Sequence, residues 1–377
     1  MNLHNNKNIT RGMMLEDITG TKRLPAFDVF KLSIQYLVNH LLETLKTRGN
    51  VVRHNEVQWV LTVPAIWTDR AKKFMRSCAE AAGIPSNNLI LALEPETASI
   101  FCQYLSTGCS DSAIGGGTAD ITVHRKAANG KLKEKHRAMG NNCGGTSIDK
   151  RFLELFEEII GETTMNSLKK ESPLAYLDLV IKEVKHVLMV GGFSECQLMQ
   201  SAVRKAFPDQ RIIIPDEAGL SVLKGAVLFG HKPDYIQSRV MRCSYGVKTN
   251  VAWNEKKYDR KHYVVMEGEE RCDNIFSLIV GKDESVEAGM IVKKSFFTPY
   301  KHQDKMDIMV YVSEETTPGY VDDDRCFLLC TPTITFSETC EERRWVDVEF
   351  VLGNTEIDLK AHDKNSGEAI SAKFNLI

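Results

Sequence analysis

The sequence lacks several features that would assign it directly to a class of proteins. It has no P-loop motif of the G-x-x-x-x-G-K-[ST] type, and its ten cysteines include no Cys-x-x-Cys pair. These absences exclude the commonest nucleotide-binding loop and leave the cysteines without zinc-ligand spacing. No apolar run is long enough to cross a bilayer. A formal net charge of −2 over 377 residues provides no attraction for nucleic acid or an anionic membrane. We therefore expect no nucleic-acid partner and no membrane partner.

The composition that remains is that of a soluble globular protein. Hydrophobic residues make up 43% of the chain and charged residues 26%, and the length suits two or three domains. The first seven residues contain no apolar segment, so we expect no secretory signal. Scattered cysteines without pairing patterns indicate reduced thiols. These features together predict a cytoplasmic protein.

The hydrophobic pattern divides the chain into two regions. Up to about residue 239, apolar runs typical of buried strands alternate with helical periodicity, which predicts an α/β domain. The expected helices cover 26–46, 69–82, 147–160, 194–207 and 216–229, with another from Glu94, and the expected strands cover 57–63, 89–93, 121–124, 186–190 and 211–214. From about residue 245, alternating runs at 308–312, 345–351 and 356–360 predict an antiparallel β region.

Three consecutive glycines form the most informative motif. Gly115, Gly116 and Gly117 carry no Cβ, so their backbone N–H groups can close on a phosphate. Thr118 adds a hydroxyl, and Asp120 can hold a cation. The run leads into an expected strand, and a strand–turn–strand loop around phosphates is typical of actin-like ATPases. Glycine runs also occur in plain linkers, so the motif depends on its surroundings.

Four further motifs follow in a fixed order along the chain. They are Leu61–Trp67, a strand ending at Pro64; Ala92–Ile100, with Glu94 at a strand-to-helix junction; Val190–Glu195, with Gly191 and Gly192 between a strand and a helix; and 214–218, which starts a helix with acidic residues that include Asp216. Each has an ordinary structural explanation, such as a tight turn or a helix cap. Their order together with the glycine run is far harder to explain by chance.

Together these motifs resemble the 70-kDa heat-shock protein family, and most closely its divergent branch, member 12. The resemblance covers nearly all of the chain. It implies an actin-like (ribonuclease H-like) α/β ATPase fold followed by a β-rich C-terminal region. The implied domains are a remnant of lobe I at 1–110, a remnant of lobe II at 111–239, and a β-rich domain at 240–377. A role in stress response and a chaperone-like activity are implied in the same way.

The resemblance also implies a role for each site residue. Gly115, Gly116, Gly117 and Thr118 would bind the β- and γ-phosphates of ATP, and Asp120 would help to hold a monovalent cation. Glu94 would be the catalytic acid near the attacking water and metal, and Pro64 would lie at the hinge between lobes. Gly144 and Gly145 would line the phosphate–ribose side of the cleft. Gly191 and Gly192 would contact the adenosine, and Asp216 would lie beside the nucleoside.

The chain departs from the family pattern at several places. The metal-site Asp two residues before the first glycine is replaced by Ala113, which puts Mg²⁺ binding in doubt. The first phosphate hairpin of the family is absent, because Asp17–Thr21 imitates it poorly. Only 46 positions separate Gly145 from Gly191, too few for most of the subdomain that covers the adenine. At Glu195 the common chaperones carry an Arg that stacks on the base.

Two explanations of these departures remain open. The chain is an incompletely assembled or alternatively spliced version of a longer protein, or it is a degenerate pseudo-ATPase. The loss of whole segments beside well-kept motifs favours the first explanation.

Three functions follow from these observations. The first is an atypical heat-shock-70-like protein that binds ATP or ADP, hydrolyses it weakly or not at all, and engages a client or signalling protein through its β region. The second is a non-enzymatic adaptor with an α/β scaffold. The third is a metabolite kinase of the actin-like superfamily, against which the β-rich final third argues.

Overall fold

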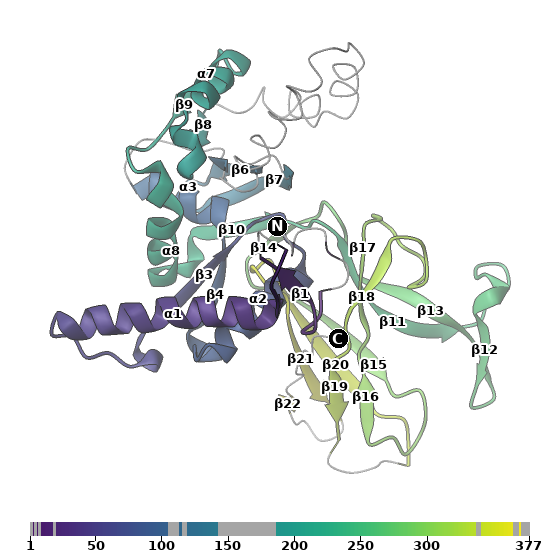
Figure 1. The fold of residues 1–377 in the computed structure, drawn as a ribbon. Helices are drawn as coiled ribbons and strands as arrows, with labels where there is room; N and C mark the ends of the chain where they lie inside the picture. The colour runs from purple at the N-terminus through teal and green to yellow at the C-terminus, as the bar shows by residue number, and fades with distance from the viewer. Residues whose placement is uncertain are drawn as a thin grey trace. The chain divides into compact units, whose positions relative to one another are not determined.

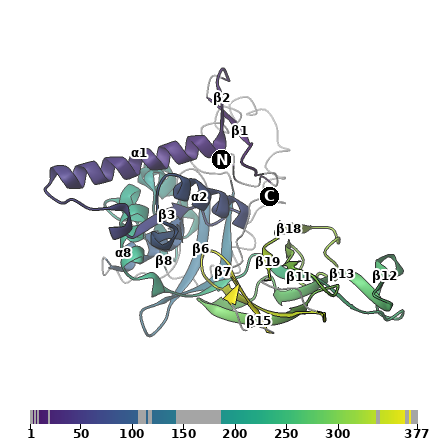
Figure 2. The same ribbon diagram turned by 90° about the horizontal axis from the view of Figure 1, so that it is seen from below.

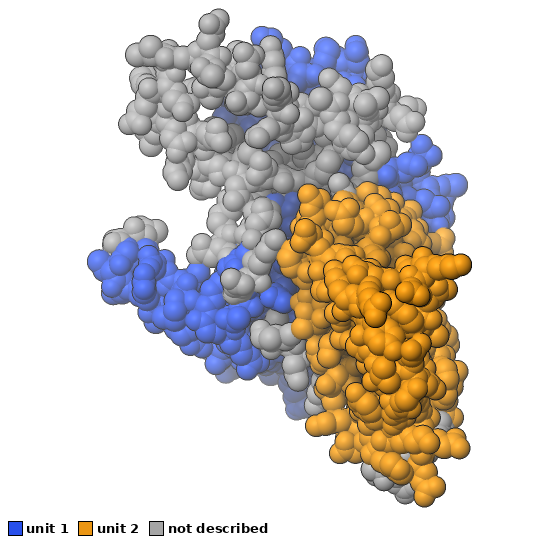
Figure 3. Space-filling view, turned by 90° about the vertical axis from the view of Figure 1, so that its right-hand side faces the viewer, with its two compact units in different colours: residues 1–237 blue, residues 238–377 orange. Residues whose placement is uncertain are grey.

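The computed structural model describes residues 3, 6, 9–17, 20–104, 113–114, 119–141, 186–336, 341–364 and 369–370. The chain forms two compact units, residues 1–237 and 238–377 (Figure 3). Helices and strands alternate in the first unit, so the fold is a mixed α/β one, and such a fold is compatible with the actin-like class. The predicted division of this unit into two lobes at residue 110 stays a prediction.

The described part of the first unit contains five α-helices and several short sheets (Figure 1). Its helices are α1 (Ala26–Thr47), α2 (Asp69–Ala81), α3 (Glu94–Tyr104), α7 (Gln197–Ala206) and α8 (Ser221–His231), of which α3 and α8 lie against each other. Its strands are β1 (Met14–Glu16), β2 (Arg23–Pro25), β3 (Trp59–Val63), β4 (Leu89–Leu93), β5 (Ala113–Ile114), β6 (Ala119–Lys126), β7 (Leu132–Asn141), β8 (His186–Met189) and β9 (Arg211–Ile213).

Strands β3 and β4 form a parallel pair that begins where the sequence predicts apolar strands. Val63, the last residue of β3, pairs with Leu93, the last residue of β4, and both side chains are buried. Beyond β3, the Thr68 hydroxyl accepts a hydrogen bond from the backbone N–H of Ala71 at 3.3 Å and caps α2. Gly83, at φ +96°, follows the end of that helix.

Helices α1 and α2 lie beside each other (Figure 2), and an aromatic contact joins them. The ring of Phe74 on α2 is fully buried and meets the rings of Phe27 and Phe30 edge-on, with centroids 5.9 Å and 6.1 Å away. The helical spacing of the apolar residues in 26–46 therefore does predict the face of α1 that packs inward. Among the described helices, none combines the length and apolar character that crossing a bilayer requires.

Helices α3 and α8 approach each other so closely that only glycine fits at the contact. A Cβ built on Gly225 would lie 1.7 Å from the carbonyl oxygen of Thr97. Such a distance is far inside van der Waals contact, so the absent side chain lets two helix backbones touch. The Nζ of Lys224 lies 5.4 Å from the ring centroid of Phe101, one turn further along α3. This crossing fixes α3 against the helix that follows the Asp216 loop.

Two predicted helix boundaries are wrong. Residues 218–220 form a turn of 3₁₀ helix, and α8 begins only at Ser221, whereas the sequence suggests a start at Asp216. The expected helix ends at 229, but α8 continues to His231 and Gly230 lies inside it, where a Cβ would come within 2.7 Å of a methyl group of Val60. The glycine therefore allows close packing of α8 against β3 and does not end the helix. Similarly, residues 192–195 form a 3₁₀ turn before α7. The helix predicted at 147–160 lies outside the described residues.

The described part of the second unit consists of strands and one 3₁₀ turn at residues 260–262. Its strands are β10 (Ile236–Val240, which begins in the first unit), β11 (Ser244–Ala252), β12 (Tyr263–Met266), β13 (Glu269–Val280), β14 (Ser285–Glu287), β15 (Met290–Phe297), β16 (Lys305–Asp307), β17 (Val310–Ser313), β18 (Cys326–Cys330), β19 (Thr333–Thr335), β20 (Trp345–Leu352), β21 (Asp358–Asp363) and β22 (Ala369–Ile370). One sheet has the order β12-β13-β11-β17-β18 and another has the order β15-β20-β21-β22.

Side chains from both of these sheets share one hydrophobic core. Alternate residues along β20, from Val346 to Leu352, point inward, and each is at most 2% exposed. The five-stranded sheet contributes Tyr245 and Val247 to the same cluster. The alternation of apolar and polar residues predicted over 345–351 therefore corresponds to β20, a strand with one buried face.

The opposite face of the four-stranded sheet carries a ladder of charged pairs. The Nζ of Lys293 lies 2.6 Å from the Glu349 carboxylate, and the Ser295 hydroxyl donates to Asp347 at 2.5 Å. The hydrogen bond from Lys293 holds the pKa of Glu349 below its ordinary value. The hydrogen bond from Ser295 does the same for the pKa of Asp347. This face is therefore solvated and charge-paired.

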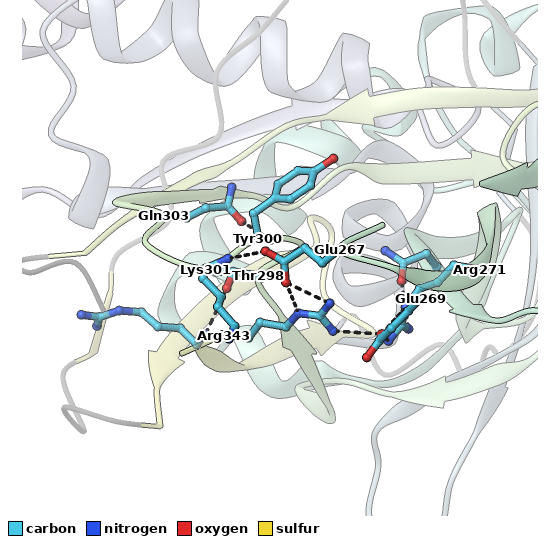
Figure 4. Close-up of polar contacts among 10 residues, drawn as sticks. Glu267, Glu269, Arg271, Thr298, Tyr300, Lys301, Gln303 and Arg343 are labelled. Atoms are coloured by element: carbon cyan, nitrogen blue, oxygen red, sulfur yellow. Dashed lines mark hydrogen bonds and ion pairs between the residues drawn. The ribbon is translucent and has the colours of Figure 1, made fainter. Parts of the chain in front are cut away.

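The tip of the β12–β13 hairpin is fixed by polar contacts (Figure 4). Glu267 (φ +49°) and Gly268 (φ +79°) form its two-residue turn. The Glu267 carboxylate accepts hydrogen bonds from the backbone N–H of Lys301 and from Nη2 of Arg343, both at 3.2 Å. The Arg343 guanidinium also lies 5.5 Å from the ring centroid of Phe297. The hairpin is thus tied to the loop after β15 and to the segment before β20.

Candidate functional site

Three of the sequence motifs follow neighbouring strands of one parallel sheet. Strand β8 lies between β5 and β9, and both pairings are parallel. The carboxyl ends of parallel strands meet at one edge of a sheet, which is where open α/β sheets bind ligands. The glycine run follows β5, Gly191 and Gly192 follow β8, and Asp216 follows β9. We call this edge the glycine edge.

The turn after β8 is closed by several hydrogen bonds. Gly191 has a φ of +88°, which favours glycine, and its N–H donates to the carbonyl of Ala218 at 2.8 Å. The buried hydroxyl of Ser194 donates to the carbonyl of Gly191 at 2.6 Å. The side-chain amide of Gln200 donates to the Ser194 carbonyl at 2.9 Å. The turn is thus fixed both to itself and to the loop after β9.

That second loop brings a further glycine beside the turn. A Cβ on Gly219 would lie 3.8 Å from the Cα of Gly192 and 3.4 Å from a carboxylate oxygen of Glu195. A Cβ on Gly192, by contrast, would meet nothing within 4 Å, and this residue is exposed. Asp216 is also exposed at the start of the loop. The two loops therefore form a side-chain-free surface beside open space, with carboxylates around it.

An ion pair crosses from this loop to α8. Lys224 on α8 pairs with the carboxylate of Glu217, and the Ser221 hydroxyl donates to the Glu217 carbonyl at 3.3 Å. Because Lys224 also lies over Phe101, the pair connects the loop after β9 with α3. Helix α8 thus holds the loop in place through both its backbone and its first turn.

Glu94 lies at the carboxyl edge of the other parallel pair. It is the first residue of α3 and directly follows Leu93, which pairs with Val63. Glu94 and Pro64 therefore follow paired residues on neighbouring strands, and both are half-buried. The Thr97 hydroxyl donates to the Glu94 carbonyl at 2.8 Å. Helix α3, which begins at Glu94, packs against α8, and α8 follows the loop after β9 at the glycine edge.

Several predicted site residues lie outside the described residues: Gly115, Gly116, Gly117, Thr118, Gly144 and Gly145. The backbone of Asp120 lies in β6, opposite Gly140 of β7. Ala113 lies in β5 opposite Leu188, where its side chain supplies no metal ligand. Where side chains are described, no three His, Cys, Asp or Glu residues gather as a metal ion would require.

Sequence reasoning missed the residues that support these loops. Ser194 is a serine two positions after a glycine pair, a weak signal for a side chain that closes a turn. Thr97 and Gly225 give no signal until the two helices are seen together. His124 is buried, and its Nδ1 lies 3.3 Å from the Ser99 hydroxyl.

Comparison with known proteins gives a consistent result. No family model matches the chain. Heat shock 70 kDa protein 12A of Homo sapiens is 27% identical, and the match covers 100% of this chain and 79% of that protein. The Mus musculus 12A protein is 26% identical and the Homo sapiens 12B protein 24%, with the same coverage.

The alignment with the human 12A protein is longer than the chain itself. It spans 534 positions against 377 residues here, a difference of 157 positions. The relative therefore has residues within the matched stretch that have no counterpart in this chain. The similarity to the heat shock 70 kDa protein 12A and 12B proteins spans the whole of this chain and supports a heat shock 70 kDa protein 12-like assignment.

Proposed function

We propose that this chain binds an adenine nucleotide, ATP or ADP, at the glycine edge within an actin-like fold. The observation that carries the proposal is the pair of loops after β8 and β9. A ligand can approach backbone there, because Gly192 faces open space and Gly219 brings no side chain. The predicted phosphate loop, from Gly115 to Thr118, follows the strand next to β8 in the same sheet. In this arrangement the nucleoside would lie at the loops after β8 and β9, and its phosphates would lie at the loop after β5.

Hydrolysis is proposed to be slow or absent. Phosphoryl transfer to water needs a metal ion and an oriented water as well as phosphate contacts. Glu94 is the proposed acid for orienting that water, and Asp120 the proposed ligand of a monovalent cation. Ala113 leaves the predicted Mg²⁺ position without a carboxylate. Loss of such a ligand removes charge stabilisation worth several kcal/mol.

Calorimetric titration of the whole chain with ATP and with ADP tests nucleotide binding. Gly192→Leu is the informative variant, since its side chain has room in the protein alone but occupies the proposed nucleoside space. Ser201→Leu, at an exposed position of α7, adds the same side chain away from the turn and is the matched control. We expect heat for the wild type and Ser201→Leu, and none for Gly192→Leu. A folded wild type without binding heat contradicts the proposal.

A turnover measurement separates the ATPase from the non-enzymatic adaptor. We expect phosphate release at or near background for the wild type. Metal-dependent turnover that is lost in Glu94→Gln would show that the chain is an ATPase despite Ala113.

The second unit is proposed to engage a partner protein through an extended segment. Strands β12 and β15 lie at the ends of their sheets, and the former exposes Val265 (60%) and the latter Ile291 (52%). Edge strands with exposed apolar side chains can add an extended peptide as a further strand. Such a partner is a client or signalling protein with an extended apolar segment, in the cytoplasm.

Fluorescence polarisation with a panel of labelled apolar heptapeptides tests this proposal. Val265→Lys and Ile291→Lys each place a charge at one edge strand, so the variant that weakens binding identifies the strand. If no peptide binds, or if neither substitution weakens binding, partner engagement through an edge strand is contradicted.

A further inference from the structure

The Glu195 carboxylate lies at the border of the glycine edge. An oxygen of Glu195 would be 3.4 Å from a Cβ on Gly219, and the backbone of Gly192 lies next to the same point. Glu195 is exposed, and it makes no ion pair with the part of the chain that the structure describes. Its carboxylate therefore lies on the Gly219 side of the turn, beside the backbone that Gly192 and Gly219 leave without side chains.

The other acidic group close by is engaged differently. Glu217 forms the ion pair with Lys224, and its charge is thereby balanced. Among the described residues Glu195 has no such cation, so its oxygens are better placed to accept hydrogen bonds from a bound molecule. A carboxylate accepts hydrogen bonds and donates none when ionised, and it has two oxygens for two donors.

Resting on the proposed nucleotide function, we propose that Glu195 accepts hydrogen bonds from the 2′- and 3′-hydroxyls of the nucleotide ribose. Glu195 would thereby select ribonucleotides over 2′-deoxyribonucleotides. In ATP, only the ribose diol presents two neighbouring hydroxyl groups, each of which can donate a hydrogen bond to one oxygen of a carboxylate. Adenine presents its N6 amine beside the N7 acceptor, so a carboxylate facing that edge meets one donor and one repulsive lone pair. Acidic side chains hold ribose hydroxyls in the same manner in dinucleotide-binding folds.

Calorimetric titration with ATP, 2′-deoxy-ATP and GTP tests the inference on the whole chain. Because a hydrogen bond to a charged acceptor is lost, we expect 2′-deoxy-ATP to bind the wild type about tenfold more weakly than ATP. Glu195→Gln, which keeps the shape but not the charge, is expected to reduce that ratio to below about threefold. Glu255→Gln removes a carboxylate from an exposed turn of the second unit and is expected to keep the wild-type ratio.

Each outcome has a distinct meaning. If neither nucleotide binds the folded wild type, the proposed nucleotide function fails and this inference fails with it. If ATP and 2′-deoxy-ATP bind equally well, or if Glu195→Gln keeps the wild-type ratio, nucleotide binding stands but the role of Glu195 is overturned. If GTP binds more tightly than ATP and Glu195→Gln removes that preference, the carboxylate reads the base and not the ribose, which also overturns the inference.

Discussion

Replacing Gly225 with alanine is expected to destabilise the first unit by about 2 kcal/mol. The new Cβ would lie 1.7 Å from the Thr97 carbonyl oxygen and 2.4 Å from its carbonyl carbon. Ordinary contact begins near 3.4 Å, so α3 and α8 would have to separate by roughly half of that distance. Overpacking of this kind costs about 1–3 kcal/mol, and backbone atoms cannot turn aside as a side chain does. Because the clash is with backbone, we take the upper end of that range, about 3 kcal/mol, and the better helix propensity of alanine returns about 1 kcal/mol, which leaves about 2 kcal/mol.

Gly230→Ala is the matched control, since it gains the same propensity in the same helix. Its Cβ would come within 2.7 Å of a Val60 methyl group, which can move. We expect Gly225→Ala to be less stable than Gly230→Ala by at least about 1 kcal/mol. Urea unfolding is followed by tryptophan fluorescence in a background in which Trp253 and Trp345 are phenylalanine, so that the signal comes from the first unit. Equal stability of the two variants would refute the reasoning.

Three further predictions concern other parts of the chain. Arg344→Ala should destabilise the second unit by about 3–5 kcal/mol in urea unfolding, because it removes the guanidinium that pairs with the carboxylate of Asp363. That carboxylate is only 2% exposed. A loss under about 1 kcal/mol would contradict this prediction. Because Lys293 lowers the pKa of Glu349, that pair stabilises above the ordinary pKa of 4.5 and loses its effect as pH falls through the lower folded-state value. The difference in melting temperature between wild type and Glu349→Gln should therefore shrink below pH 4.5, and a constant difference would be evidence against it. Burial raises the pKa of Cys78 to about 12, so native protein should resist iodoacetamide at this residue at pH 8 while urea-unfolded protein reacts; equal labelling of both would count against a buried thiol.

The sequence predicts well those elements whose pattern is local. Strand β4 occupies the predicted residues 89–93, because five apolar residues are bounded by a helix start at Glu94. Helix α1 likewise follows its helical spacing to within one residue. In both cases neighbouring residues alone decide the structure.

The boundaries of α8 could not be predicted, because distant residues decide them. The carbonyl of Ala218 accepts the N–H of Gly191, so the loop before α8 is shaped by another turn. A glycine at 230 suggests a helix end, yet Gly230 lies inside α8, where the lack of a side chain lets the helix pack closely against Val60. Neither neighbour is visible in a local window of sequence.

The candidate site is predicted in outline only. The sequence places Gly191, Gly192 and Asp216 after strands, and parallel pairing of β8 with β9 brings those ends together. The hydroxyl of Ser194, which closes the turn, becomes apparent only when its distance to Gly191 is known. The roles predicted for Gly115 and its neighbours stay predictions.

The hydrogen bonds of the turn after β8 have a consequence for the timing of ligand binding. The bonds from Gly191 to Ala218 and from Ser194 to Gly191 exist without any ligand. The conformational entropy of these residues is thus lost when the protein folds and not when a ligand arrives. A nucleoside reaching this turn would meet a finished surface, so its association rate should depend on encounter and not on a slow rearrangement of the turn.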